Sequence, residues 1–201
     1  MKTKKEIVSE FRRTEIIDAA RTVFARRGFA HGIIDEIADE AGMAKGTVYL
    51  YFRSKTEIYK AVLDHDMKIL KQSTLDRIDA APTLQAKIGA FILSRIQNAE
   101  TRREFFLIMD SDEENVAPTR SQFHEFLREP VQRLAASLSE ASARGEVYPI
   151  PAEKAACEKT AWLIADMTRG VIQRRLMGLN SGSAAEEADF LLAFVWRALA
   201  P

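Results

Sequence analysis

The segment GMAKGTVYLYFRSK, residues 42–55, holds two tyrosines and a phenylalanine among lysines and glycines. Its apolar spacing predicts a short helix over residues 44–52, because Val48 and Phe52 lie one helical turn apart and face the same way. The other side of this helix then carries a mixed polar and aromatic set: Lys45, Gly46, Thr47, Tyr49, Leu50 and Tyr51. Solubility alone does not require such a surface, so it indicates recognition of another molecule.

The residues before this segment predict two further helices. Apolar side chains recur every three or four positions ahead of Gly28 and again ahead of Gly42, and glycine commonly ends a helix. The two stripes are Ile16, Ala20, Val23 and Phe24, and then Ile34, Ile37, Ala38 and Ala41. Two short helices joined by AGMA and preceded by a longer one form a helix-turn-helix pattern. After them, SKTE at residues 54–57 is a capping box that opens a long helix to about Ala80.

The remainder of the chain also predicts helices and gives almost no strand signal. The expected helices cover residues 84–99, 101–111, 118–144, 152–178 and 184–200, with segments rich in proline, glycine and polar residues between them. We therefore predict an all-α fold of about nine helices. Residues 1–56 are expected to form a compact head of three helices, and residues 57–201 a larger helical body.

Composition favours a packed chain whose N-terminal part is mildly basic. Hydrophobic residues make up 47% of the 201 residues, which favours a folded core over disorder. Residues 1–60 contain 12 Lys/Arg and 9 Asp/Glu, a net charge of +3, whereas the remainder contains 17 against 20, a net charge of −3. The positive sign of the first part is the one expected for a nucleic-acid partner.

Several classes of function are disfavoured by what the sequence lacks. The single cysteine, Cys157, lies in an apolar helical pattern and is expected to be buried rather than reactive. The basic N-terminus has no apolar signal-peptide core, and no apolar run is long enough to span a membrane, so we expect a cytoplasmic protein. The three histidines lie in different elements, which predicts no metal site. No catalytic or cofactor-binding motif is present, so neither an enzyme nor a cofactor is expected.

The polar side chains of the opening segment match the chemistry of a DNA duplex. Tyrosine and threonine hydroxyls and lysine ammonium groups bind phosphates, and a glycine lets a helix approach the groove closely. Lys55 adds a cation in the first turn of the next helix, beside free backbone N–H groups that also favour a phosphate. The predicted DNA-binding residues are Lys45, Gly46, Thr47, Tyr49, Tyr51 and Lys55.

Residues 37–55 follow the pattern IA-x-x-AG-x-x-x-G-T-aliphatic-Y-x-Y-F-x-x-K, within a longer stretch from about Arg13 to Leu63. This stretch resembles the TetR family of transcriptional regulators. The resemblance implies a three-helix DNA-binding head and a helical body that dimerises and often binds a small-molecule inducer. Carried over by position, it implies that Lys45, Gly46 and Tyr49 face base edges, while a second group holds the DNA backbone: Thr47, Tyr51 and Lys55.

Three departures from the family pattern concern the contacts around the second helix. Family members usually begin it with Thr or Ser, but Gly32 and Ile33 stand there, and Gly32 is an acceptable N-cap without a hydroxyl. Ala44 replaces a common Ser, so the recognition helix also lacks a capping side chain. Asp35 suits the helix dipole but would repel a nearby phosphate. The sequence leaves open whether four arginines contact phosphates or form a solvated face: Arg12, Arg13, Arg26 and Arg27.

The last two helices are apolar on more than one face, which indicates that they need a partner surface. The resemblance implies that they pair with the same helices of a second subunit in a four-helix bundle. A two-fold homodimer presents two recognition helices to a palindromic site on double-stranded DNA. The predicted dimerisation residues are Trp162, Gly170, Phe190, Leu191, Phe194 and Val195.

The central helices carry aromatic and flexible apolar side chains that either line a cavity or only fill the core. A cavity formed by them would be mostly apolar and would suit a small hydrophobic or aromatic effector. The predicted ligand-binding residues are Phe91, Phe105, Phe106, Met109, Phe123, Phe126, Leu127, Trp162 and Met167.

Together these features predict a sequence-specific DNA-binding transcriptional regulator, a repressor that a small effector releases from a palindromic operator. Two alternatives remain open. One is an architectural or adaptor protein of the same fold without an inducer, which a body without a cavity would favour. The other is a ligand-binding dimer that no longer reads DNA, which loss of salt-dependent DNA binding would favour.

Overall fold

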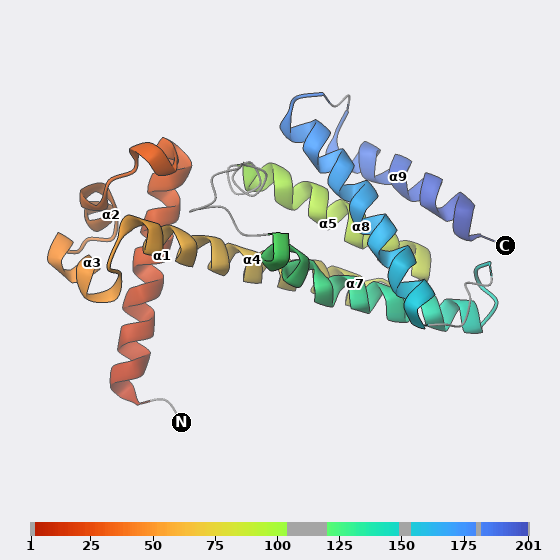
Figure 1. Cartoon of the computed structure of the whole chain (residues 1–201), viewed down its shortest axis with the longest axis horizontal. Helices are drawn as coiled ribbons and strands as arrows, with labels where there is room; N and C mark the ends of the chain where they lie inside the picture. The colour runs from red at the N-terminus through yellow and green to blue at the C-terminus, as the bar shows by residue number, and fades with distance from the viewer. Residues whose placement is uncertain (1–2, 104–119, 149–153, 180–181, 201) are drawn as a thin grey trace. The chain divides into compact units, whose positions relative to one another are not determined.

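The computed structural model describes residues 3–103, 120–148, 154–179 and 182–200. Within these ranges every regular element is a helix, which confirms the all-α prediction (Figure 1). The eight helices are α1 (Lys4–His31), α2 (Ile34–Glu40), α3 (Lys45–Tyr51), α4 (Lys55–Ala80), α5 (Leu84–Thr101), α7 (Arg120–Ala143), α8 (Lys154–Leu176) and α9 (Ala184–Leu199). The helix predicted over residues 101–111 lies almost entirely outside the described residues.

The described residues form two compact units, one up to Met67 and one from Lys68 onward. The division falls inside α4, so this helix contributes residues to both units. The first unit contains α1, α2 and α3, and the second contains α5, α7, α8 and α9. The functional boundary expected between residues 56 and 57 stays a prediction.

The core of the first unit is built from the apolar stripes that the sequence shows. Ile16 and Val23 of α1, Ile37 of α2 and Val48 of α3 are all fully buried. Helix α2 packs against both α1 and α3. Each short helix therefore contributes one or two apolar side chains to a core that α1 dominates, and burial rather than length keeps the short helices folded.

Gly28 breaks α1 without ending it. Its backbone has φ 71° and ψ 168°, whereas the residues on either side are helical up to His31. The amide of Gly32 then donates a hydrogen bond of 3.1 Å to the carbonyl of Gly28. The sequence correctly places a stop at this glycine, but the chain makes one more turn before it leaves the helix.

The core of the second unit is formed by α5, α7, α8 and α9, with α7 packed on α8 and α9 packed on α5. Its fully buried side chains include Phe91, Leu134, Leu138 and Ile164. Cys157 is also buried and unpaired, as the sequence predicts. None of the helices in the described ranges combines the length and apolarity that crossing a bilayer requires.

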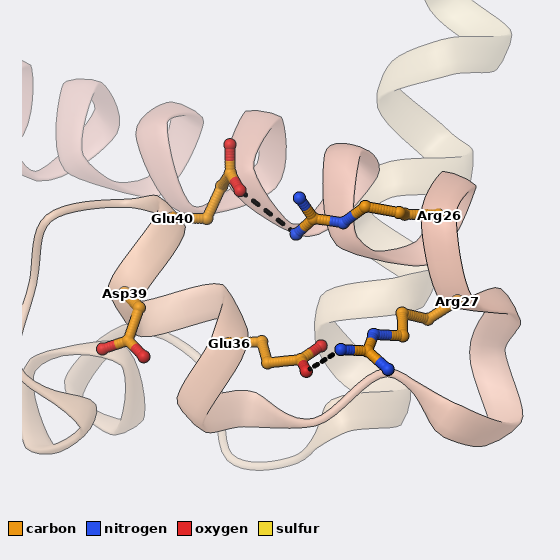
Figure 2. Close-up of a pocket in the computed structure, with 5 residues that line it drawn as sticks. All are labelled: Arg26, Arg27, Glu36, Asp39 and Glu40. Carbon is orange, nitrogen blue, oxygen red and sulfur yellow. Dashed lines mark hydrogen bonds and ion pairs between the residues drawn. The ribbon is translucent and has the colours of Figure 1, made fainter.

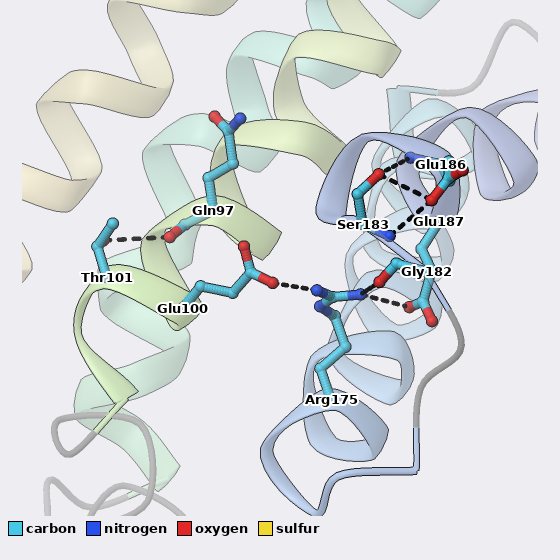
Figure 3. Close-up of polar contacts among 8 residues, drawn as sticks. All are labelled: Gln97, Glu100, Thr101, Arg175, Gly182, Ser183, Glu186 and Glu187. Carbon is cyan, nitrogen blue, oxygen red and sulfur yellow. Dashed lines mark hydrogen bonds and ion pairs between the residues drawn. The ribbon is translucent and has the colours of Figure 1, made fainter.

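One ion network joins three helices of the second unit (Figure 3). Arg175 of α8 forms ion pairs with Glu100 of α5 and, at 3.7 Å, with Glu187 of α9. It also donates a hydrogen bond of 3.0 Å to the carbonyl of Gly182. Only 9% of the Arg175 side chain is exposed, so this burial is compensated by two carboxylates and a carbonyl.

We expect Gly28→Ala to destabilise the first unit by about 1–2 kcal/mol, because an L-residue with a side chain is strained at positive φ. The matched control is Gly170→Ala in α8, where an added Cβ meets nothing within 4 Å. That control should stabilise its helix by about 1 kcal/mol, because alanine is the better helix former. Thermal and urea unfolding followed by circular dichroism measure both, and a Gly28→Ala protein as stable as wild type would contradict the strain.

Candidate nucleic-acid interface

The turn between α2 and α3 is fixed by its own backbone hydrogen bonds. Gly42 has φ 63°, a left-handed conformation that glycine adopts without strain. Its amide donates to the carbonyl of Asp39 at 3.1 Å, and the amide of Met43 donates to that of Ala38 at 2.9 Å. This pair of bonds is the Schellman closure of a helix, and it sets the direction in which the chain enters α3.

Helix α3 is anchored on one side and at its end. Val48 and Phe52 are buried, as their spacing predicts. The Arg13 guanidinium of α1 donates a 3.0 Å hydrogen bond to the carbonyl of Tyr51 and lies 4.1 Å from the centre of the Phe52 ring. A cation at the C-terminus of a helix is favoured by the free carbonyls there. Arg13 therefore acts as a C-terminal cap for α3, which sequence reasoning did not identify.

The opposite side of α3 brings most of the predicted DNA-binding residues to one exposed surface. Lys45, Gly46 and Tyr49 are exposed, with 46% of Tyr49 accessible to solvent. Leu50 is 82% exposed on the same short helix and was not among the predicted contacts. The remaining two predicted residues of this helix, Thr47 and Tyr51, are half-buried. We call the surface formed by Lys45, Gly46, Tyr49 and Leu50 the α3 face.

Lys45 on the α3 face forms an ion pair with Asp35 of α2. Its Nζ lies 2.9 Å from Oδ2 of Asp35, and about half of each side chain is exposed. The hydrogen bond that Lys45 donates to Asp35, aided by the negative charge of that carboxylate, raises the pKa of Lys45 above its usual value, so the amine stays protonated at neutral pH. Asp35 thus holds the lysine that is expected to approach DNA, rather than only adding negative charge nearby.

Lys55 is also engaged within the chain. Its Nζ donates hydrogen bonds to the carbonyls of Phe29 at 2.8 Å and Ala30 at 3.1 Å, and lies 4.5 Å from the centre of the Phe29 ring. These carbonyls belong to the turn that follows the break at Gly28. The sequence placed Lys55 beside free N–H groups, whereas the structure shows it bound to free C=O groups.

The arginines whose role the sequence left open are paired with carboxylates or a carbonyl. Arg26 and Arg27 of α1 form ion pairs with Glu40 at 3.3 Å and Glu36 at 2.8 Å, both on α2 (Figure 2). Together with Asp39 they line an open surface depression of about 690 Å³. Three carboxylates against two guanidinium groups make this depression a poor phosphate site. The fourth arginine, Arg12, pairs with Glu15 at 2.9 Å.

The helix starts around the interface partly match the sequence analysis. The N-cap of α2 is Ile33 and not the expected Gly32, and the N-cap of α3 is Ala44. Neither residue supplies a side-chain hydrogen bond to its helix. At the start of α4, the Ser54 hydroxyl accepts from the amide of Glu57 at 3.1 Å. The Glu57 carboxylate accepts from the amide of Arg53 at 2.7 Å, one residue before the one that a capping box predicts.

Residues 16–62 match the family model described as bacterial regulatory proteins, tetR family. Over this N-terminal region the chain therefore resembles the TetR family of transcriptional regulators, as the sequence predicts. It is 26% identical over 184 residues to the transcriptional regulator TtgR of Pseudomonas putida, covering 88% of this chain and 84% of TtgR. It is 36% identical over 81 residues to the transcriptional repressor KstR2 of Rhodococcus jostii, covering 38% of this chain and 40% of KstR2.

The fold agrees with solved TetR-family structures. The structure of FadR from Bacillus subtilis in complex with stearoyl-CoA superposes with a TM-score of 0.69 at 21% identity, covering 92% of this chain and 98% of FadR. At that identity the likeness concerns the fold. The family consists of transcriptional regulators, a class of protein that acts by binding rather than by catalysis.

The ligand residues predicted for the helical body lie in several different environments. Phe91 and Leu127 are buried in the core, and Phe126, Trp162 and Met167 are half-buried against it. The Trp162 ring stacks on His124 with centroids 4.2 Å apart. Three of the predicted residues, and the side chain of a fourth, lie outside the described part of the chain: Phe105, Phe106 and Met109, and Phe123.

The predicted dimerisation set is split by burial. Leu191 and Val195 of α9 are 7% and 4% exposed and belong to the core of their own unit, so their place in a subunit interface stays a prediction that this burial does not favour. Phe190 and Phe194 lie on a neighbouring face of α9 and are 78% and 61% exposed. Gly170 is exposed on α8 and makes no close approach to another element of the described chain.

We expect Asp35→Asn to tighten DNA binding several-fold, because it frees the Lys45 ammonium for the duplex and removes a negative charge that repels the approaching DNA. The slope of log K against log salt should steepen by about one unit for each added phosphate contact. Fluorescence anisotropy with duplex DNA from upstream of the protein's own gene, at two salt concentrations, measures both quantities. Asp39→Asn, on the same helix but away from Lys45, is the control for charge alone, and equal gains from both would refute a specific effect on Lys45.

Proposed function

We propose that this regulator is a homodimeric repressor that binds a palindromic double-stranded operator and is released by a small effector. The exposed α3 face is the observation that supports this most directly. A folded chain has no internal use for a tyrosine and a leucine exposed side by side on a seven-residue helix. In a major groove, a tyrosine hydroxyl meets base-edge donors and acceptors, and a leucine meets thymine methyl groups.

Within this proposal the contacts divide by position. Lys45, Gly46 and Tyr49 face the base edges, and Leu50 joins them at the end of the helix. Thr47 and Tyr51, half-buried at the border of the face, direct their hydroxyls to the DNA backbone. Lys55 contributes one donor to a phosphate, because an ammonium group has three N–H bonds and two are taken by carbonyls.

The proposed dimer uses the exposed side of α9 together with α8. Phe190 and Phe194 are separated by one helical turn, and Leu163 of α8 is also 61% exposed. The two helices contact each other, and each carries an exposed apolar side chain that the proposed interface would cover. Exposed aromatic side chains on adjoining helices favour burial against a second copy of the same surface, which a two-fold axis provides.

The effector site is proposed for the second unit, where a cavity is lined by residues of α4, α5 and α7. The FadR structure, which shares this fold, was solved in complex with stearoyl-CoA, a ligand that carries a long apolar chain. Helix α4 carries cavity residues at one end and continues to Lys55 at the other. We propose that the effector favours a conformation of α4 in which the two heads of the dimer no longer fit successive major grooves.

We expect Tyr49→Ala to weaken operator binding at least about tenfold, because one good base contact is worth about 1–3 kcal/mol. The measurement is anisotropy with the upstream duplex and with a shuffled duplex of the same composition. Tyr148→Ala is the matched control, since Tyr148 is an exposed tyrosine of the second unit. The loss should be confined to the upstream duplex, and equal affinity of wild type for both duplexes would refute sequence-specific reading.

A promoter–reporter assay tests the direction of regulation. Expression should rise when the regulator is deleted and when an effector is added. A fall on deletion would identify an activator instead. Sequence-specific binding that no effector alters would favour the architectural or adaptor alternative.

We expect Phe194→Glu to convert the dimer into a monomer, because it places a charge at the centre of the proposed apolar interface. Phe11→Glu is the matched control, because Phe11 is a phenylalanine of equal 61% exposure on α1 in the first unit. Light scattering after size exclusion gives the mass of each variant. A dimeric Phe194→Glu protein would place the interface elsewhere.

A further inference from the structure

The cavity in the second unit has a mainly apolar surface, and a buried cation is among the residues that line it. Two of the predicted ligand residues, Phe126 and Leu127, lie on its wall together with Leu70 and Pro130. Four polar residues also line it, although their polar atoms supply little of its surface: Lys71 and Thr74 of α4, and Arg95 and Asn98 of α5. Its volume is about 10 Å³, space for about one water molecule.

Arg95 is the unusual member of this wall. It is only 5% exposed, and within the described residues it donates a single hydrogen bond, from Nη1 to the carbonyl of Ala165 at 2.8 Å. Its guanidinium carbon lies 5.3 Å from the centre of the Phe91 ring. Burial lowers the pKa of Arg95 to about 10, with the charge of Asp166 opposing that shift, so the group is still a cation at neutral pH.

The other walls of the cavity do not neutralise this cation. The Lys71 ammonium is paired with Glu129 at 2.9 Å. The Thr74 hydroxyl donates to the carbonyl of Leu70 at 3.0 Å and accepts from Ser94 at 3.3 Å, so it remains a neutral neighbour. Among the residues that the structure describes, no carboxylate forms an ion pair with Arg95.

Arg175, a second largely buried arginine of the same unit, has charge partners that Arg95 lacks among the described residues. That guanidinium is met by the carboxylates of Glu100 and Glu187 and by a backbone carbonyl (Figure 3). A buried charge is costly unless it is paired and hydrogen-bonded. The pairing of Arg175 is not complete, because its Nε has no hydrogen-bond partner among the described residues. Arg95 differs in having no described carboxylate in an ion pair with it, and it donates one of its five N–H groups to a described acceptor. Its guanidinium is a planar donor group of the kind that suits a carboxylate.

We propose that Arg95 binds the carboxylate of an acidic effector whose apolar part lies against Phe126 and Leu127. This inference rests on the proposed function, because it names the chemistry of the ligand at the proposed effector site. The carboxylate adds an ion pair, which no described residue forms with Arg95, to the charge of Asp166, and the low dielectric of the core strengthens the pair. A cavity of this volume opens on binding, and the half-buried side chain of Phe126 is the wall that moves.

The experiment compares matched acidic and neutral probes: octanoate with octanamide, and benzoate with benzamide. Binding to the full-length protein is followed by calorimetry and by the shift of the unfolding temperature. We expect at least one carboxylate to bind wild type about tenfold or more tightly than its amide, because a hydrogen bond to a charged group contributes about 1.5–3 kcal/mol.

Three variants separate binding from folding. Arg95→Met should bind carboxylate and amide alike, with an unfolding temperature at or above that of wild type, because methionine fills the space without a buried charge. Arg95→Lys keeps the cation and should retain part of the preference, because it lacks the two-pronged geometry. Arg133→Met removes an arginine whose partner is Asp79, away from the cavity, and should bind like wild type.

The proposal is overturned if neither carboxylate binds wild type more tightly than its amide, or if Arg95→Met keeps the preference. Operator binding is measured in parallel so that the two proposals fail separately. A carboxylate that binds through Arg95 without releasing the operator leaves the anion site intact and refutes the effector role. Wild type that never binds the operator specifically refutes the repressor role, while the probe comparison still decides the anion site.

Discussion

The hydrogen bond from the Arg13 guanidinium to the C-terminal end of α3 is the contact on which the α3 face depends. A helix of seven residues is far too short to be stable alone, and α3 begins at Ala44 without a side-chain cap. Its position comes from Val48 and Phe52 in the core, from the glycine turn before it, and from the guanidinium that holds the Tyr51 carbonyl. The position of the α3 face therefore depends on contacts with α1 as much as on the sequence of α3 itself.

The cations around this face are already bound within the chain, and this changes how DNA affinity arises. Lys45 is held by Asp35, Lys55 by two carbonyls, and Arg26 and Arg27 by glutamates of α2. A phosphate must compete with these partners, so the net gain per contact is smaller than for a free lysine. The ion pair also keeps Lys45 in one place, which reduces the entropy lost on binding. We therefore expect the DNA affinity of this head to depend more on its geometric fit to the duplex than on non-specific attraction between its cations and the phosphates.

The sequence predicted the parts of the structure that follow from local chemistry. Periodicity located the helices, glycine located the break in α1 and the turn before α3, and the spacing of Val48 and Phe52 identified the exposed side of the recognition helix. The Lys45–Asp35, Arg13–Tyr51 and Lys55–Phe29 contacts join residues that are far apart in sequence, and periodicity carries no information about them. On α9, apolar side chains lie on two neighbouring faces, and the pattern alone could not tell the buried Leu191 and Val195 from the exposed Phe190 and Phe194.

The cavity shows a further limit of apolar patterning. Aromatic residues predicted a hydrophobic pocket, yet a buried cation, Arg95, also lines it and has one hydrogen bond and no ion pair within the described chain. Its one protein bond runs from α5 to the carbonyl of Ala165 on α8, two positions from exposed Leu163. An anion that accepts hydrogen bonds from the Arg95 guanidinium must compete with the Ala165 carbonyl or change the geometry of the hydrogen bond to it. Effector chemistry would then act on α8, the helix that joins α9 in the proposed dimer surface, as well as on α4.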